Sequence, residues 1–180
     1  NYYDGARSFM GHKAYNTPAD LKGAVIRTPG ADPYVESISA MGATPYNIAW
    51  SEVYNGIQTK SIDGCEVQYT SAVSSKVCEY VSKTEHINLF NMVICGQAWF
   101  DKLPAEYQEV MKKDFNDCAY NNAQDIIAAQ DDMEKTLTDN GMTIVEVDKD
   151  IFREAVKPAY EKLGWTELRE QLYKEAGVEA

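Results

Sequence analysis

The sequence predicts an α/β fold with a mainly parallel sheet. From Leu21 onward, short runs of β-branched and apolar residues alternate with segments that have helical periodicity. The chain after Pro104 has helical periodicity almost throughout. With 180 residues, of which 44% are hydrophobic, the chain is long enough to bury a core as one domain or a small two-lobed unit.

The first half contains repeated strand and helix signals. Residues 24–28 are apolar and β-branched, and the Pro29–Gly30 turn ends this first strand before Asp32 and Pro33 begin a helix. A second strand is expected to end at 47–49, where Ser51 caps a helix that continues to about Ile62. Two strand–helix units in succession favour parallel pairing of the strands.

The next elements follow the Asp63–Gly64 turn. A third strand is predicted over 65–69, a helix from about 71 to 80, and a longer apolar strand over 87–95. A last strand is expected over 143–147, after the Asn140–Gly141 stop.

The second half is mostly helical. From Pro104 the apolar positions recur at steps of three or four residues, and no proline or glycine interrupts them before Gly141. This predicts one helix of about thirty-five residues or two in tandem, too long to lie on one compact layer, so we expect it to bridge two lobes. Two further helices are predicted over 150–163 and 166–176.

The charge excludes some functions and suggests where others lie. Seventeen basic and 28 acidic residues give a net charge of −11, which repels nucleic acid and anionic membrane surfaces. No apolar run approaches the length of about 18 residues needed to span a bilayer, so the chain is not expected to be membrane-embedded. Residues 1–95 have a net charge of −2 and residues 96–180 a net charge of −9, so a small anion is expected to bind in the first half.

Neither a metal nor a cofactor is expected. The four cysteines have no CxxC spacing, and most are expected to be small buried hydrophobic residues: Cys65, Cys78, Cys95 and Cys118. No phosphate loop, zinc spacing, nucleophile elbow or calcium loop occurs. The chain opens without Met or a signal peptide, which suggests a mature, trimmed or truncated form, so its first residues do not indicate localisation.

Arg27 is the strongest candidate for a binding residue. It ends the first predicted strand, and ligands of open parallel sheets bind at the carboxyl ends of the strands. A planar guanidinium suits a carboxylate held by two hydrogen bonds, and the helix beginning near Asp32 would favour the same anion. The alternative is a structural ion pair with Glu66 or Asp63. Trp50, at the end of the second strand, is either a core residue or a platform for the ligand.

The motifs of the chain resemble those of the solute-binding proteins of tripartite ATP-independent periplasmic (TRAP) transporters. Order, spacing and residue type all match in these segments: DLKGAVIRTP at 20–29, MGATP at 41–45, SEVY at 51–54, IQT at 57–59, IDGCE at 62–66, TEH at 84–86, FDKLP at 100–104 and FREAVKP at 152–158. The chain is similar to roughly the last three-fifths of that family's sequence.

The resemblance implies roles for five residues. Arg27 falls on the arginine that forms the salt bridge to the ligand carboxylate, and Arg7 matches the spacing of a second arginine that often contacts the ligand. Trp50 matches an aromatic residue that packs on the ligand. In the third strand Glu66 is retained and is expected to belong to the ligand-binding site, but Val67 replaces an asparagine that often hydrogen-bonds the ligand. Trp50 and Val67 would form an apolar wall, which favours a monocarboxylate with an apolar or aromatic body over a small dicarboxylate.

The resemblance also implies an architecture and partners. The family has a two-lobed periplasmic-binding-protein fold with crossing strands and a long hinge helix. The second lobe would comprise residues 5–89 and 130–180, whereas residues 90–129 would belong to a first lobe whose N-terminal part is absent. Such a receptor is not an enzyme; it works outside the cytoplasm and delivers a small organic acid to a TRAP membrane permease.

Two alternatives come from other functional classes. Cys65 and His86 are the one conceivable nucleophile–base pair of a hydrolase or transferase, although no residue is evident to orient the histidine. The other alternative is a truncated lobe that acts as an interaction fragment or a domain-swapped dimer.

Overall fold

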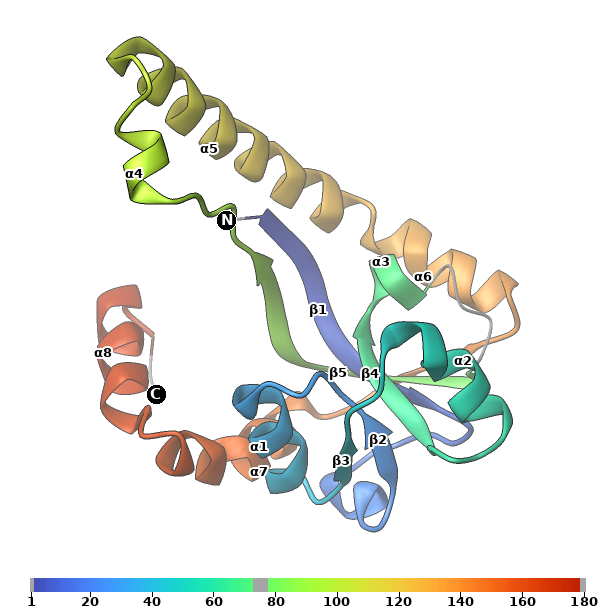
Figure 1. Ribbon diagram of the computed structural model, residues 1–180. Coiled ribbons are helices and arrows are strands. Elements are labelled where there is room, and N and C mark those ends of the chain that lie inside the picture. The colour runs from blue at the N-terminus through green and yellow to red at the C-terminus, as the bar shows by residue number, and fades with distance from the viewer. Residues whose placement is uncertain (1, 73–77, 179–180) are drawn as a thin grey trace.

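One mixed sheet organises the computed structural model, which describes residues 2–72 and 78–178 (Figure 1). Within these residues the sheet has six strands in the order β3-β2-β4-β1-β5-β6. Their bounds are β1 Tyr2–Gly11, β2 Val25–Arg27, β3 Thr44–Tyr46, β4 Gly64–Gln68, β5 Tyr80–Asn91 and β6 Thr143–Glu146. Strand β2 is parallel to β3 and β4, and β5 is parallel to β6, but β1 is antiparallel to both β4 and β5. The predicted α/β class is therefore confirmed, with an antiparallel strand at the centre of the sheet.

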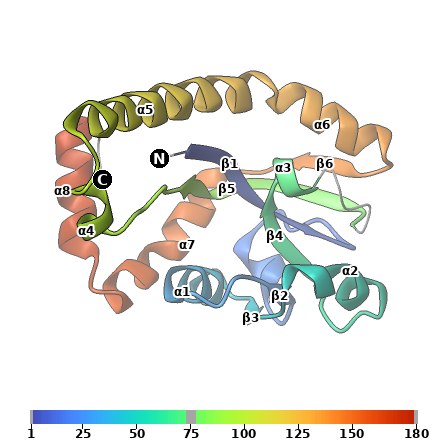
Figure 2. The ribbon, with the colours of Figure 1, turned by 45° about the horizontal axis from the view of Figure 1, so that its top comes forward.

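Helices cover both faces of this sheet. Their bounds are η1 Pro18–Leu21, α1 Asp32–Ala40, α2 Trp50–Gln58, α3 Tyr69–Ala72, α4 Gln97–Phe100, α5 Ala105–Ala128, α6 Gln130–Asp139, α7 Lys149–Lys162 and α8 Thr166–Ala176. Figure 2 shows α5 and α6 along one side of the molecule, with α1 and α7 toward the other. Among the described helices, none combines the length and the apolarity needed to cross a bilayer.

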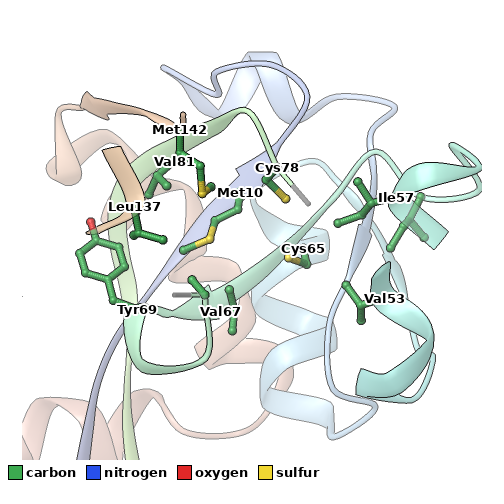
Figure 3. Close-up of a cluster of buried hydrophobic side chains, with 12 residues drawn as sticks. Met10, Val53, Ile57, Cys65, Val67, Tyr69, Cys78, Val81, Leu137 and Met142 are labelled. Carbon is green, nitrogen blue, oxygen red and sulfur yellow. The ribbon is translucent and has the colours of Figure 1, made fainter. Parts of the chain in front are cut away.

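Alternation along the strands divides the core into two clusters. Met10, Cys65 and Val67 face α2, α3 and α6, where they pack with residues such as Val53 and Leu137 (Figure 3). Phe9 and Ile26 face the opposite side, where they pack with residues of α1 and α7. Neighbouring residues of one strand therefore serve different layers of the protein.

Several predicted boundaries differ from those of the structure. The second strand ends at Tyr46 rather than at 47–49, because residues 47–49 lead into α2. Pro45 is tolerated within this strand because β3 is at the edge of the sheet. Strand β5 begins at Tyr80 and ends at Asn91, so the predicted strand over 87–95 was placed too late. The predicted helix over 71–80 is wrong at Tyr80, while its residues 73–77 lie outside the described part of the chain.

The helical second half follows the prediction more closely. The long segment forms two helices in tandem, α5 and α6, which are separated at Ala129. Helices α7 and α8 agree with the predicted 150–163 and 166–176 within one residue. Helix α5 contacts β1, and Asn122 donates a hydrogen bond to the Tyr3 carbonyl (2.6 Å). The division into lobes at residues 89 and 129, and the domain-swapped dimer, stay predictions.

Gly64 gives a direct test of the β1–β4 packing. A Cβ built on Gly64 would lie 2.2 Å from the Met10 carbonyl oxygen of the neighbouring strand. We expect Gly64→Ala to lower the free energy of unfolding by about 1–3 kcal/mol, because the backbones of β1 and β4 must separate. Urea denaturation followed by circular dichroism would measure this.

Gly96→Ala is the matched control, since a Cβ there meets nothing within 4 Å. A Gly64→Ala variant no less stable than Gly96→Ala would contradict the close approach of the two strands.

Candidate functional site

Arg27 lies at the carboxyl end of β2, as the sequence predicts. Its residue surface is 9% exposed, and its Nε donates a hydrogen bond to the Ile48 carbonyl (3.2 Å). Burial lowers the pKa of Arg27 from its ordinary value, although the nearby Glu66 charge opposes this. Within the described residues no carboxylate lies within ion-pair distance of Arg27. The alternative structural pairing is not observed, because Glu66 pairs with Arg7 and Asp63 accepts from the Val25 amide (2.7 Å).

Trp50 lies beside this guanidinium. The Arg27 Cζ is 5.4 Å from the centroid of the Trp50 ring, within the range of a cation–π contact. Trp50 is the first residue of α2 and is 39% exposed. The structure thus brings together Arg27 and Trp50, two of the five predicted site residues, with the indole ring accessible.

Arg7 is bound within the protein. It is 5% exposed, and its Nε forms a hydrogen bond and ion pair with Glu66 Oε2. Its Nη2 donates to Glu66 Oε1 (2.9 Å) and to the Glu66 carbonyl (2.6 Å), and its Nη1 donates to Gln68 Oε1 (3.0 Å). Four of the five guanidinium N–H groups are used in this way. The Tyr34 ring of α1 covers the same guanidinium, with 5.2 Å from Cζ to the ring centroid.

Glu66 is the centre of this buried polar network. Its side chain is fully buried, and it also accepts a hydrogen bond from Thr28 Oγ1 (2.6 Å). His86 Nε2 lies 3.8 Å from Glu66 Oε2, and Nδ1 of the same ring lies 2.8 Å from Thr84 Oγ1. Burial alone would raise the pKa of Glu66, but His86 and Arg7 outweigh burial and lower that pKa, so the carboxylate is ionised.

The two arginines occupy opposite faces of the sheet. Arg27 is paired with Cys65 across β2 and β4, so it shares a face with Cys65 and Val67. Arg7 is opposite Gln68 across β1 and β4, and it shares the other face with Glu66. Val67 is 3% exposed and packs in the core cluster with Met10 and Leu137 (Figure 3). Its side chain thus offers almost no surface to a ligand.

The candidate nucleophile and base do not meet. The Cys65 thiol faces the α2 side, whereas His86 stacks on Phe9 on the α1 side, with 4.4 Å between ring centroids. A hydrogen bond with Cys78 and burial both raise the pKa of the Cys65 thiol, which disfavours the thiolate that a nucleophile requires. The expectation that most cysteines are buried is wrong for Cys95 and Cys118, which are exposed.

Sequence reasoning missed the partners of the network. Thr28, Tyr34, Gln68 and His86 all contact Arg7 or Glu66, or lie within 4 Å of them. The alternation Glu66–Val67–Gln68 in β4 was the available signal, since it puts two polar side chains on one face of a buried strand. Tyr34 and His86 also line a cavity of about 450 Å³ between α1, β5 and α7.

Comparisons with known sequences identify relatives of this chain. The profile of the bacterial extracellular solute-binding proteins, family 7, matches residues 1–165. The C4-dicarboxylate-binding periplasmic protein DctP of Vibrio cholerae is 30% identical over 119 residues, which are 64% of this chain and 36% of that protein. Solute-binding protein RD1_1052 of Roseobacter denitrificans is 32% identical over 159 residues, or 86% of this chain and 49% of that protein. The chain thus spans about half the length, or less, of these curated relatives.

Solved structures share the fold. A TRAP periplasmic solute-binding protein from Escherichia fergusonii, in an apo open structure, has a TM-score of 0.88 and 33% identity, over 97% of this chain and 60% of that one. A second, from Sulfitobacter, contains bound β-D-galacturonate and has a TM-score of 0.84 and 32% identity, over 95% of this chain and 59% of that one.

These matches confirm the predicted resemblance and the two-lobed binding-protein fold class. They also confirm that the relatives are receptors rather than enzymes. The chain belongs to the bacterial extracellular solute-binding proteins of family 7, whose matched structures are TRAP periplasmic receptors.

Proposed function

We propose that this chain carries the carboxylate-anchoring part of an extracytoplasmic receptor, which binds a small organic acid and delivers it to a TRAP membrane permease. One observation carries the proposal: Arg27, at the carboxyl end of β2, has no carboxylate partner among the described residues. A guanidinium desolvated in this way gains most from an anionic ligand that fills its remaining N–H donors.

Trp50 completes the anchor. Its exposed ring covers one side of the Arg27 guanidinium, and the Ile48 carbonyl fixes the Nε side of the same group. The terminal nitrogens are thereby held in place for a carboxylate that lies in the plane of the guanidinium. Such preorganisation lowers the entropy that binding would otherwise cost.

Arg7 and Glu66 support the anchor in this proposal. Most Arg7 donors are engaged by Glu66 and Gln68, so a ligand would meet at most the remaining N–H of Arg7. Glu66 also accepts from Thr28, the residue directly after Arg27, and so fixes the end of β2. We therefore assign Glu66 to positioning and not to ligand contact.

The relatives indicate the ligand class and the compartment. The Sulfitobacter protein binds β-D-galacturonate, and the Vibrio cholerae relative is named for C4-dicarboxylates and for the periplasm. A carboxylate is the group these ligands share, which is the group that Arg27 would bind. We infer that the receptor works in the periplasm or an equivalent extracytoplasmic space.

Replacing Arg27 tests the anchor. Arg27→Ala in the intact receptor should weaken binding of its organic acid by about 2–3 kcal/mol, because a desolvated carboxylate loses its charged hydrogen-bond partner. Arg27→Lys should recover only part of this, since an ammonium lacks the planar fork. Isothermal titration calorimetry with D-galacturonate, benzoate and succinate would measure the affinities.

Arg153→Ala is the matched control, since Arg153 is an exposed arginine on α7 that pairs with Asp150. If Arg27→Ala binds every acid as tightly as Arg153→Ala does, Arg27 is not part of the site.

Replacing Glu66 tests whether its ionised carboxylate stabilises the fold by pairing with Arg7. The pKa of Glu66 is lower in the folded protein than in the unfolded chain, where it is about 4.5. The ionised Glu66 carboxylate therefore contributes its full stabilisation above pH 4.5. That stabilisation is lost as the pH falls through the folded-state pKa. Glu66→Gln should therefore destabilise the protein by about 3 kcal/mol at pH 7, because Arg7 is left as an unpaired buried charge. The difference between wild type and variant should shrink well below pH 4.5.

Urea denaturation at pH 7 and at pH 3 would measure the difference in free energy of unfolding between wild type and Glu66→Gln at each pH. Glu109→Gln, which changes an exposed carboxylate on α5, is the control and should be nearly neutral at both pH values. A stability difference between wild type and Glu66→Gln that is independent of pH would rule out an ionised Glu66.

A further inference from the structure

Tyr46 stands next to Arg27 in the sheet. Strands β2 and β3 pair in parallel with Arg27 opposite Tyr46, so the two side chains leave the sheet on the same face. The Thr28 amide donates to the Tyr46 carbonyl (3.1 Å), which holds Tyr46 level with the end of β2. Tyr46 is therefore at the same sheet edge as the proposed anchor.

The segment that begins at Tyr46 wraps around the Arg27 guanidinium. Two residues later the Ile48 carbonyl accepts from Arg27 Nε (3.2 Å), and four residues later the Trp50 ring lies against the Arg27 Cζ (5.4 Å). The Trp50 ring thus contacts the arginine from the first residue of α2, and Tyr46 lies opposite Arg27 on the edge strand β3.

The protein's own packing does not use the Tyr46 ring. Tyr46 is 48% exposed, and within the described residues its ring and hydroxyl form no hydrogen bond or ring contact. Helix α2 buries Val53, Gly56 and Ile57 instead, while Trp50 in its first turn stays accessible. Two large accessible aromatic side chains, Tyr46 and Trp50, therefore lie on the same sheet face as a guanidinium that has no carboxylate partner among the described residues. Aromatic rings at such a place can pack on a flat ligand.

We propose that Tyr46 is a specificity-determining residue, which together with Trp50 favours acids whose carboxylate is attached to a ring over acyclic acids. The inference rests on the proposed function, since the ring is positioned by the carboxylate on Arg27. The faces of a sugar ring or an aromatic ring present C–H groups or π electrons that pack on Tyr and Trp, whereas a short acyclic chain covers little of either ring.

Calorimetry on the intact receptor tests this with three variants and two probes, D-galacturonate as the ring acid and succinate as the acyclic one. Tyr46→Ala should weaken D-galacturonate binding by about three- to tenfold, the range of one aromatic contact, and should change succinate binding by less than about twofold. Tyr46→Phe keeps the ring and should retain the wild-type affinity for D-galacturonate. Tyr54→Ala removes a similarly exposed tyrosine one turn beyond Trp50 and should have no effect on either acid.

The outcomes separate this inference from the proposed function. The role of Tyr46 is wrong if Tyr46→Ala loses the same affinity for both acids, or loses none for either acid. It is also wrong if Tyr54→Ala loses as much affinity for D-galacturonate as Tyr46→Ala does. A loss in Tyr46→Phe equal to that in Tyr46→Ala would overturn ring packing. If the wild-type receptor binds succinate but does not bind D-galacturonate, the preference for ring acids is wrong, while the assignment of Arg27 as the carboxylate anchor stands. Binding of both acids that survives Arg27→Ala would instead reject the anchor itself.

Discussion

The buried ion pair between Arg7 and Glu66 is the interaction on which the rest of this structure depends. An ionised carboxylate with no exposed surface is tolerated because Arg7 pairs with it, Thr28 donates a hydrogen bond to it, and the His86 ring lies 3.8 Å away. The pair also joins three neighbouring strands, β1, β2 and β4, at the level where β2 ends. Arg27 lies on the opposite face of the sheet from Glu66, and it has no carboxylate within ion-pair distance among the described residues.

The two faces of the sheet have different roles. On the α1 side, the polar side chains of Arg7 and Glu66 satisfy one another and fix the strands. On the α2 side, Arg27 and Trp50 lie on the same face as the hydrophobic cluster that contains Cys65 and Val67. Strand β4 contributes to both faces because its successive side chains point to opposite sides of the sheet. Glu66 therefore joins the ion pair with Arg7 on one face, whereas Val67, the next residue, packs in the hydrophobic cluster on the other.

Local sequence signals predicted much of this arrangement. Arg27 could be chosen because a charged residue at the end of an apolar strand is costly without a partner. Trp50 was chosen through the family resemblance, since its position at a strand–helix junction left a core role open. The helices after Pro104 were predicted well because long periodic segments carry strong signals. The pairing of Arg7 with Glu66 could not be predicted, because it depends on the antiparallel register of two strands 59 residues apart. Strand β1 was missed for the same reason, since its central position comes from its neighbours and not from its own residues.

Helix α5 has a consequence for motion on the time scale of amide hydrogen exchange. It has 24 residues, yet among them Ala119 alone is classed as buried. Most of the stability of a helix in a protein comes from tertiary packing of an apolar face, and α5 has little of it. Within this chain α5 can therefore open locally at a small fraction of the free energy needed to unfold the sheet. Its backbone amides should exchange with solvent long before those of β1 and β4.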